Sequence, residues 1–427
     1  MQALGRATFM AMQLSRRVRG LKPSSTVAVM NKAKALLAQG VPVLNFSAGE
    51  PDFDSPEVAK AAAISAIRDN QTKYIPAAGD PASRNLVAEI LTKKNQIPGV
   101  TPDHVVITTG VKMALYLAFQ CLFDSPTSGE APGELILPVP AWVSFAPMAA
   151  LAGAKVVEVP TTAAGAFKMT PAQLRAAITP CTRVVLVNSP SNPCSTMYTP
   201  DELRALAAVV EEAGRTVAPN ITIVADELYQ NIVFGAVPFM SIGSIAGVAE
   251  RTLTINGPGK SFAMTGWRLG WLSGSGAFGK QVCDAIGKLQ GQTTTCVPAF
   301  CLAGMRAALT EGGPDLERSR QAFAKRADLI FALLSAIPNL PVAKPLGAFY
   351  VFPDLAAHLG KTTPSGKKLA TPVDFAAALL DERQMAVVPG EDFGGAGLHS
   401  IRMSFACSDE QIREGCKRLG EFLAELR

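Results

Sequence analysis

Hydrophobic positions in the first 270 residues follow two periods. Short apolar runs predict strands, and the amphipathic stretches between them predict helices. The strands are expected at 41–46, 105–109, 135–139, 154–159, 183–188, 221–225 and 252–255. Strands that alternate with helices predict a mostly parallel sheet with right-handed crossovers. Ligands bind such sheets at the carboxyl ends of the strands, so the residues that follow each run are the first candidates for chemistry.

After residue 269 the pattern changes to long helical stretches with a few short strands. Helices are expected at 280–290, 298–309, 314–334 and 408–426, and strands at 345–352, 386–390 and 399–405. A chain of 427 residues exceeds the size at which a single core stops growing. We therefore expect an α/β fold with a large domain at 56–300 and a smaller α+β domain at 301–427. Residues 1–55 are expected to join the small domain, because the strand at 41–46 needs a partner sheet.

Composition excludes several classes of protein. The chain is 48% hydrophobic with a net charge of +5, and no basic run is interleaved with aromatic residues, which argues against nucleic-acid binding. No apolar run reaches the length of a membrane span. The eight cysteines form no C-x-x-C pair and the three histidines are isolated, so no metal site is expected. Unpaired cysteines in apolar runs favour a reducing, cytoplasmic location.

The stretch 256–270 carries the strongest chemical signal. Two glycines and a proline after the strand at 252–255 predict an irregular loop, which Lys260 closes. A lysine in a dry pocket can lose its proton and form a Schiff base. Arg268, flanked by glycines, suits a phosphate because its planar fork bonds oxyanions in pairs. Taken alone, both side chains could equally be ordinary solvated surface residues.

Polar residues follow several of the other predicted strands. Gly110 opens a helix after the strand at 105–109, which is the arrangement of an anion site. Asn192 lies in a proline-rich loop, and Asp226 and Tyr229 follow the strand at 221–225. Each has a purely structural alternative, since Asn192 suits a turn and Asp226 a helix cap. Their common position at strand ends favours a shared site.

Eleven segments together resemble one family along nearly the whole chain. They are KPSSTVAV, SAGEPDFD, KYIPAAG, TTGVKMAL, PAWVSF, NSPSNP, VADELY, NGPGKSFAMTGWRLG, GAFYVF, VVPGEDF and IRMSF. In this order they resemble the pyridoxal-phosphate-dependent aminotransferases of fold type I (class I/II), and among these the bacterial-type aspartate aminotransferases. The resemblance implies pyridoxal 5'-phosphate as cofactor and a homodimer with shared active sites.

The resemblance also implies a role for each matching residue. Lys260 would bind the cofactor covalently and carry the proton, and Asp226 would pair with the cofactor's ring nitrogen. Tyr229 and Asn192 would bond its ring hydroxyl. The remaining implied cofactor contacts are Trp142 on the ring face, Arg268, Gly110, Val111 and Lys112 on the phosphate side, and Tyr74 from the partner subunit.

Substrate contacts are implied in the same way. Arg402 would bind the α-carboxylate while the Gly49 backbone closes over it, and Trp142 and Asn192 would also contact the substrate. Lys112 and Thr26 match the residues associated with the distal carboxylate of a dicarboxylic substrate. Several positions depart from the family pattern: Ala141, Val111, Cys194, Pro258 and Gly259. They leave every catalytic group in place.

The implied function is a ping-pong transaminase that moves an amino group between an L-amino acid, with aspartate favoured, and a 2-oxo acid such as 2-oxoglutarate. An aromatic, prephenate or kynurenine aminotransferase is one alternative, and a β-elimination lyase on the same fold is another. A regulatory ligand-binding protein is a third, disfavoured because the N-terminus is too short for a helix-turn-helix domain and because Lys260, Asp226 and Arg268 are all present.

Overall fold

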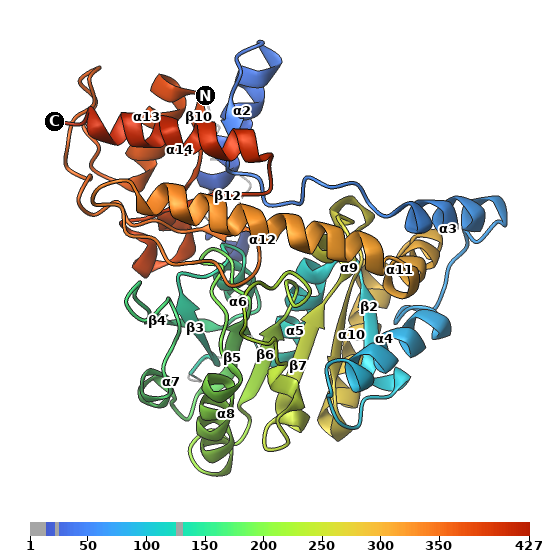
Figure 1. The fold of residues 1–427 in the computed structure, drawn as a ribbon. Coiled ribbons are helices and arrows are strands. Elements are labelled where there is room, and N and C mark those ends of the chain that lie inside the picture. Colours follow the sequence, from blue (N-terminus) through green and yellow to red (C-terminus); the bar gives the residue numbers. More distant parts are fainter. Residues whose placement is uncertain (1–13, 22–24, 125–130) are drawn as a thin grey trace, which may run out of the picture.

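The computed structural model describes residues 14–21, 25–124 and 131–427. Its centre is a seven-stranded sheet with the order β2-β8-β7-β6-β5-β3-β4 (Figure 1). The strands are β2 (Val105–Thr108), β3 (Glu134–Val139), β4 (Lys155–Pro160), β5 (Thr182–Asn188), β6 (Thr222–Asp226), β7 (Thr252–Asn256) and β8 (Gly270–Gly274). Six of these lie where the sequence predicts them, within one or two residues at each end.

Strand β8 was not predicted, and it makes the sheet mixed. It pairs antiparallel with both β2 and β7, whereas β4, β3, β5, β6 and β7 pair parallel with one another. Its sequence, GWLSG, has a glycine at each end and no alternation of apolar and polar residues, so it gives no strand signal. The sheet is otherwise parallel, as expected.

Helices cover both faces of this sheet. On one face lie α5 (Val111–Leu122), α6 (Phe145–Leu151) and α10 (Gly276–Thr293), whose buried side chains pack with those of β3, β5 and β8. On the other face α8 (Pro200–Arg215) packs beside α7 (Pro171–Ala177), while α4 (Pro81–Lys93) and α11 (Ala299–Glu311) cover β2 and β8. In the central strands β3, β5 and β6 alternate residues point to the two faces and both sets are apolar, which explains their nearly continuous hydrophobic runs.

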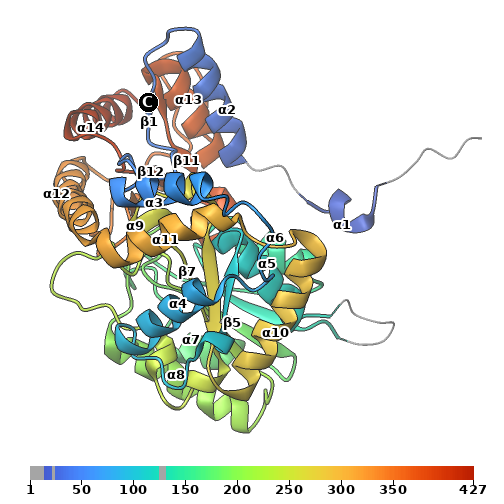
Figure 2. The ribbon, with the colours of Figure 1, turned by 90° about the vertical axis from the view of Figure 1, so that its right-hand side faces the viewer.

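The C-terminal elements form a second body above the sheet (Figures 1 and 2). They are α12 (Gly313–Ser335), β9 (Tyr350–Val351), α13 (Pro372–Arg383), β10 (Met385–Ala386), β11 (Val388–Pro389), β12 (Ile401–Ser404) and α14 (Asp409–Ala424). Strands β11, β12 and β9 form an antiparallel sheet. The expected strand at 345–352 is only two residues long, because residues 345–349 and residue 352 do not continue a regular strand.

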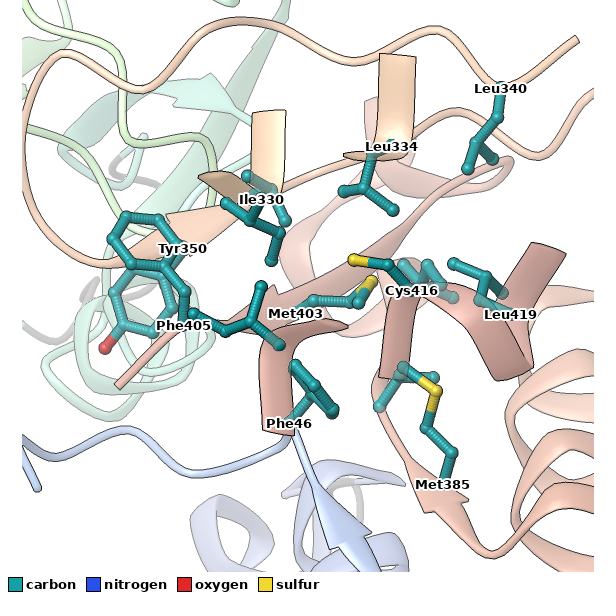
Figure 3. Close-up of a cluster of buried hydrophobic side chains, with 14 of the residues drawn as sticks. Phe46, Ile330, Leu334, Leu340, Tyr350, Met385, Met403, Phe405, Cys416 and Leu419 are labelled. Carbon is teal, nitrogen blue, oxygen red and sulfur yellow. The ribbon is translucent and has the colours of Figure 1, made fainter. Parts of the chain in front are cut away.

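The N-terminal segment packs against this second body. Strand β1 (Leu44–Asn45) pairs parallel with β10, and Phe46 is buried among Ile330, Met403 and Phe405 (Figure 3). Helix α2 (Ser25–Ala38) packs on α13. The chain then descends to α3 (Glu57–Arg68), which lies along α11. The division into domains at residues 55 and 300 stays a prediction.

Two further features of the structure concern membrane-spanning helices and disulfide bonds. Among the described residues, no helix is both long enough and apolar enough to cross a membrane. All eight cysteines are free thiols.

Candidate active site

The carboxyl edge of the central sheet brings the predicted polar residues together. Asn188 and Asp226 end adjacent strands in register, and Asp226 is paired in turn with Ile255, one residue before the end of β7. Arg268 precedes β8, but because β8 is antiparallel its beginning lies at this same edge. All these strand ends therefore face one cavity of about 530 Å³. The predicted site residues that line it are Gly49, Gly110, Val111, Lys112, Trp142, Asn192, Asp226, Tyr229, Lys260, Arg268 and Arg402.

Lys260 lies in a short helix rather than in the irregular loop that the sequence predicts. Helix α9 (Pro258–Ser261) begins at Pro258. The fixed φ of proline suits the first helical turn, and its lack of an N–H costs no hydrogen bond there, because the first N–H groups of a helix have no partner within the helix. Lys260 Nζ donates a hydrogen bond to the Gly49 carbonyl. Burial lowers the pKa of Lys260 from its ordinary 10.5 to about 8, and the positive charges of Arg402 and Arg268 act in the same direction. Lys260 therefore loses its proton far more readily than a surface lysine.

Asp226 is the buried carboxylate of the cavity. It is only 4% exposed, and its Oδ1 accepts a hydrogen bond of 3.2 Å from the Leu228 backbone N–H. Burial raises its pKa to about 7, although that bond and the charge of Lys260 pull the pKa down. A cationic partner within the cavity would hold this carboxyl group ionised.

An anion cradle lies at the start of α5. A Cβ on Gly110 would come within 2.5 Å of Arg268 Nη2, so only glycine allows the guanidinium to lie there, and Gly110 also has a positive φ of 84°. No side chain caps the N-terminus of α5. Arg268 Nη1 donates to the Thr265 carbonyl at 2.8 Å, which holds the guanidinium beside the helix end. A helix N-terminus and an arginine suit a phosphate group.

Arg402 on β12 is the buried cation of the cavity. It is 5% exposed; its Nη1 donates to Asn192 Oδ1 at 3.2 Å and its Nη2 to the Ser47 carbonyl at 3.0 Å. Its guanidinium also lies 4.6 Å from the centre of the Tyr350 ring. Burial lowers its pKa. Among the described residues its Nε has no hydrogen-bond partner, so the guanidinium retains donor capacity for a carboxylate.

Three further predicted residues surround these charges. The Tyr229 hydroxyl lies 3.0 Å from the Tyr350 hydroxyl, and burial raises its pKa well above the ordinary value. Trp142 forms one wall, and Lys112 Nζ lies 5.0 Å from the centre of its ring. Burial and the nearby Arg268 charge lower the pKa of Lys112.

Two predicted residues are not placed in the cavity. Tyr74 is 85% exposed and does not line the cavity of its own chain. Thr26 belongs to α2, but its side chain lies outside what the structure describes.

The sequence reasoning also missed residues that line the cavity. Asn188 donates to the Asp226 carbonyl at 3.0 Å and accepts from the Asn192 backbone N–H at 3.0 Å, and its position at the end of a predicted strand was an available signal. Glu50, Lys34 and Tyr350 also line the cavity. Nothing in their local sequence indicates this, because all three arrive from outside the central sheet.

A lysine with a lowered pKa, a buried carboxylate and an arginine–glycine cradle define a site for covalent carbonyl chemistry on an anionic cofactor. Residues 41–419 match the family Aminotransferase class I and II, and the chain belongs to that family. Membership implies pyridoxal phosphate as the cofactor.

Individual relatives cover almost the whole chain. It is 39% identical to the aspartate/prephenate aminotransferase of Cereibacter sphaeroides over 95% of this chain and 97% of that protein. It is 36% identical to the aspartate aminotransferase of Bacillus subtilis over 96% of this chain and 99% of that protein. Among solved structures, the aspartate aminotransferase of Rhizobium meliloti superposes with a TM-score of 0.89 at 34% identity, covering 98% of this chain and all of that one. The aspartate aminotransferase of Thermus thermophilus with maleate superposes with a TM-score of 0.86 at 37% identity, covering 96% of this chain and 100% of that one.

Proposed function

We propose that this aminotransferase moves the amino group of aspartate to 2-oxoglutarate by a ping-pong mechanism. The observation that carries the proposal is the convergence of Lys260, Asp226 and Arg402 in one cavity with the cradle formed by Gly110 and Arg268. Relatives named aspartate or aspartate/prephenate aminotransferase support the substrate class. The β-elimination lyase is not favoured, because these relatives are named aminotransferases.

The residues of the cavity fit pyridoxal phosphate. Arg268 and the Gly110–Val111 backbone would hold its phosphate, Asp226 its ring nitrogen, Asn192 and Tyr229 its hydroxyl, and Trp142 its ring face. Lys260 would bind it covalently. The bound cofactor supplies an electron sink for the bond that breaks at the substrate's α-carbon. Asp226 keeps its negative charge beside a cationic ring, which offsets the burial that otherwise raises its pKa.

The chain's own groups then position the substrate and move its proton. Arg402 pairs with the α-carboxylate and so orients the Cα–H bond toward Lys260. The substrate's amino group takes the place of Lys260 on the cofactor and so frees the lysine amine. Lys260 Nζ then accepts the Cα proton, which its lowered pKa favours near neutral pH. Its hydrogen bond to the Gly49 carbonyl would then give way to these contacts.

Lys112, together with Thr26, is proposed to bind the distal carboxylate of a dicarboxylic substrate. Lys112 lines the cavity beside Trp142. The Thermus enzyme was solved with maleate, which is a dicarboxylate, and this supports the assignment. Prephenate is also a dicarboxylate, so the same subsite would accept it.

A homodimer with shared active sites is the proposed assembly. Tyr74 is exposed, and α3 presents Ile64 and Ile67 to solvent at 49% and 48% exposure. Contiguous exposed apolar groups mark contact surfaces, and Tyr74 would reach the phosphate in the partner subunit's cavity. The cytoplasmic location stays a prediction.

The central test is Lys260→Ala. Turnover of aspartate with 2-oxoglutarate should fall by about 10⁴-fold or more. After borohydride reduction, mass spectrometry should no longer detect cofactor bound covalently to the chain. Lys280→Ala removes an exposed lysine from α10 and serves as the control, with both readouts unchanged. Wild-type turnover in the Lys260 variant would refute the assignment.

Substrate choice needs a separate test. Lys112→Ala should reduce kcat/KM for aspartate by about 10-fold or more while it changes that for alanine or phenylalanine little, because only aspartate has a second carboxylate. Equal losses would reject the subsite. Pyruvate and ammonia from wild-type protein without an amino acceptor would instead indicate a lyase.

A further inference from the structure

The cavity contains a cation for which the proposed reaction has no use. Its described lining includes five basic residues and two acidic ones, and four of the basic residues have roles in the proposed function. The fifth is Lys34, which α2 contributes together with Met30. These two residues are four positions apart on one helix, so they share a face.

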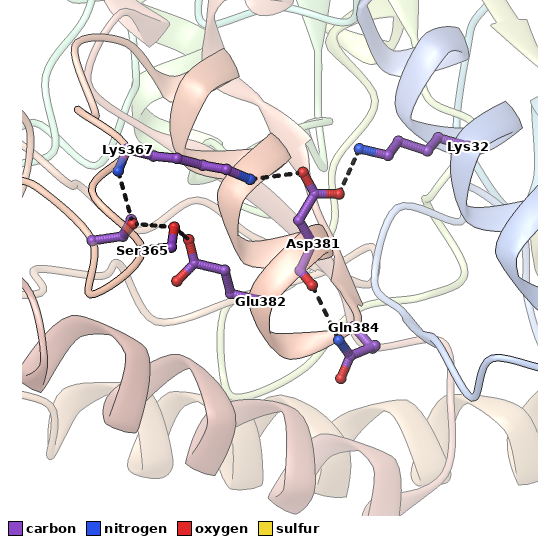
Figure 4. A network of polar contacts seen from close by, with 7 residues as sticks. Lys32, Ser365, Lys367, Asp381, Glu382 and Gln384 are labelled. Carbon is purple, nitrogen blue, oxygen red and sulfur yellow. Dashed lines mark hydrogen bonds and ion pairs between the residues drawn. The ribbon is translucent and has the colours of Figure 1, made fainter.

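Contacts on its other sides fix α2 in this orientation. Lys32 Nζ lies 2.6 Å from Asp381 Oδ1 on α13, and Lys367 holds the other oxygen of that carboxylate at 3.0 Å (Figure 4). Ala33 is completely buried in a cluster with Val43 and Leu380. Three consecutive residues of α2 thus serve three purposes. Lys32 ties the helix to α13, Ala33 enters the core, and Lys34 lines the cavity.

Lys34 has no carboxylate to neutralise it. No described acidic residue lies within ion-pair distance of its ammonium, whereas Lys32 on the same helix has one. Lys112, the other cation at the cavity mouth, comes from α5 under the central sheet, and its pKa is already lowered by burial and by Arg268. Lys34 and Lys112 therefore line a cavity with more cationic than anionic side chains, and an anionic ligand offsets that excess charge.

We propose that Lys34 is a specificity-determining residue that binds the distal carboxylate of dicarboxylic substrates from the α2 side, in addition to Lys112. The inference rests on the proposed function and adds a second charge to its distal subsite. A dicarboxylate brings a second negative charge to this cationic lining, whereas a monocarboxylate does not. Lys34 therefore favours dianionic over monoanionic substrates through binding.

The experiment compares substrates in the holoenzyme. Lys34→Ala should lower kcat/KM for aspartate and for 2-oxoglutarate about three- to fivefold, the size expected for one partly solvated ion pair, and leave alanine within about 1.5-fold. The loss should appear in KM rather than kcat. Lys34→Arg should restore the wild-type ratio, and Lys93→Ala, an exposed lysine on α4, controls for net charge.

Maleate binding provides a readout without turnover. Its dissociation constant should rise about three- to fivefold in Lys34→Ala, and the difference from wild type should shrink in high salt. An unchanged constant, or equal losses for aspartate and alanine, would overturn the role of Lys34. Failure of the wild-type holoenzyme to transaminate any dicarboxylate would instead overturn the proposed function, so the two failures are distinguishable.

Discussion

The interior of the cavity and its mouth hold charged side chains in opposite environments. Inside, Asp226 and Arg402 are buried, and burial shifts both pKa values. At the mouth, Lys34 and Lys112 are exposed. Desolvation makes an interior charge expensive unless the ligand pairs with it, so interior groups can drive chemistry. Solvated charges at the mouth contribute less energy and are suited to choosing among substrates.

The largest expected effect tests the interior. Asp226→Asn should reduce kcat by about 10³-fold, because a neutral amide cannot hold a cationic ring. The cofactor-free protein should be as stable as wild type or more stable, since the change removes a buried carboxyl with a raised pKa. Steady-state kinetics and urea unfolding measure the two quantities. A large loss of stability would mean that Asp226 acts as a structural group.

Arg402→Lys comes next. It should reduce kcat/KM by about 10²-fold for aspartate and alanine alike, because an ammonium lacks the planar fork that bonds a carboxylate twice. This uniform loss contrasts with the selective loss expected at the mouth. A loss confined to dicarboxylates would assign Arg402 to the distal subsite.

Stability against pH separates the two environments directly. The pKa of Lys260 is lowered in the folded state to about 8 and is 10.5 in the unfolded state, so the unfolded chain binds more protons between these values. Stability of the cofactor-free protein should therefore rise from pH 8 to 10.5, and Lys260→Met should remove roughly 1–3 kcal/mol of that rise. Urea midpoints at pH 7.5 and 10 measure this rise, and identical slopes for wild type and the Lys260 variant would contradict the burial of Lys260.

The sequence predicts cavity residues on the central sheet better than those that other elements bring to the cavity, for a physical reason. Asp226 and Asn192 follow apolar runs that form strands, so a local pattern places them at the sheet edge. Lys34 reaches the cavity only because α2 packs on α13, a contact between residues about 350 positions apart. Strand β8 was missed because its glycines and its tryptophan make no alternating pattern. Arg402 lies on β12, outside the central sheet, and its role was predicted from the family resemblance.

The smallest expected effect concerns the support of the mouth. Asp381→Asn removes the carboxylate between Lys32 and Lys367 and should lower the free energy of unfolding by less than about 1 kcal/mol, because the pairs are partly solvated. The preference for aspartate over alanine should fall slightly, because α2 then holds Lys34 less firmly. Denaturation and paired substrate assays measure this, and an unchanged preference would mean that Ala33 and its core contacts suffice to position the helix.

The antiparallel direction of β8 has a consequence for how the catalytic groups are connected. The segment 257–269 joins two hydrogen-bonded neighbours, with Asn256 opposite Trp271, and it contains both Lys260 and Arg268. A parallel neighbour would have required a helix-length crossover between them. The covalent and the anion-binding functions therefore occupy one hairpin connection and share its register. Any insertion, deletion or strand slip in this connection displaces Lys260 and Arg268 together. The two residues are therefore expected to change position jointly rather than independently.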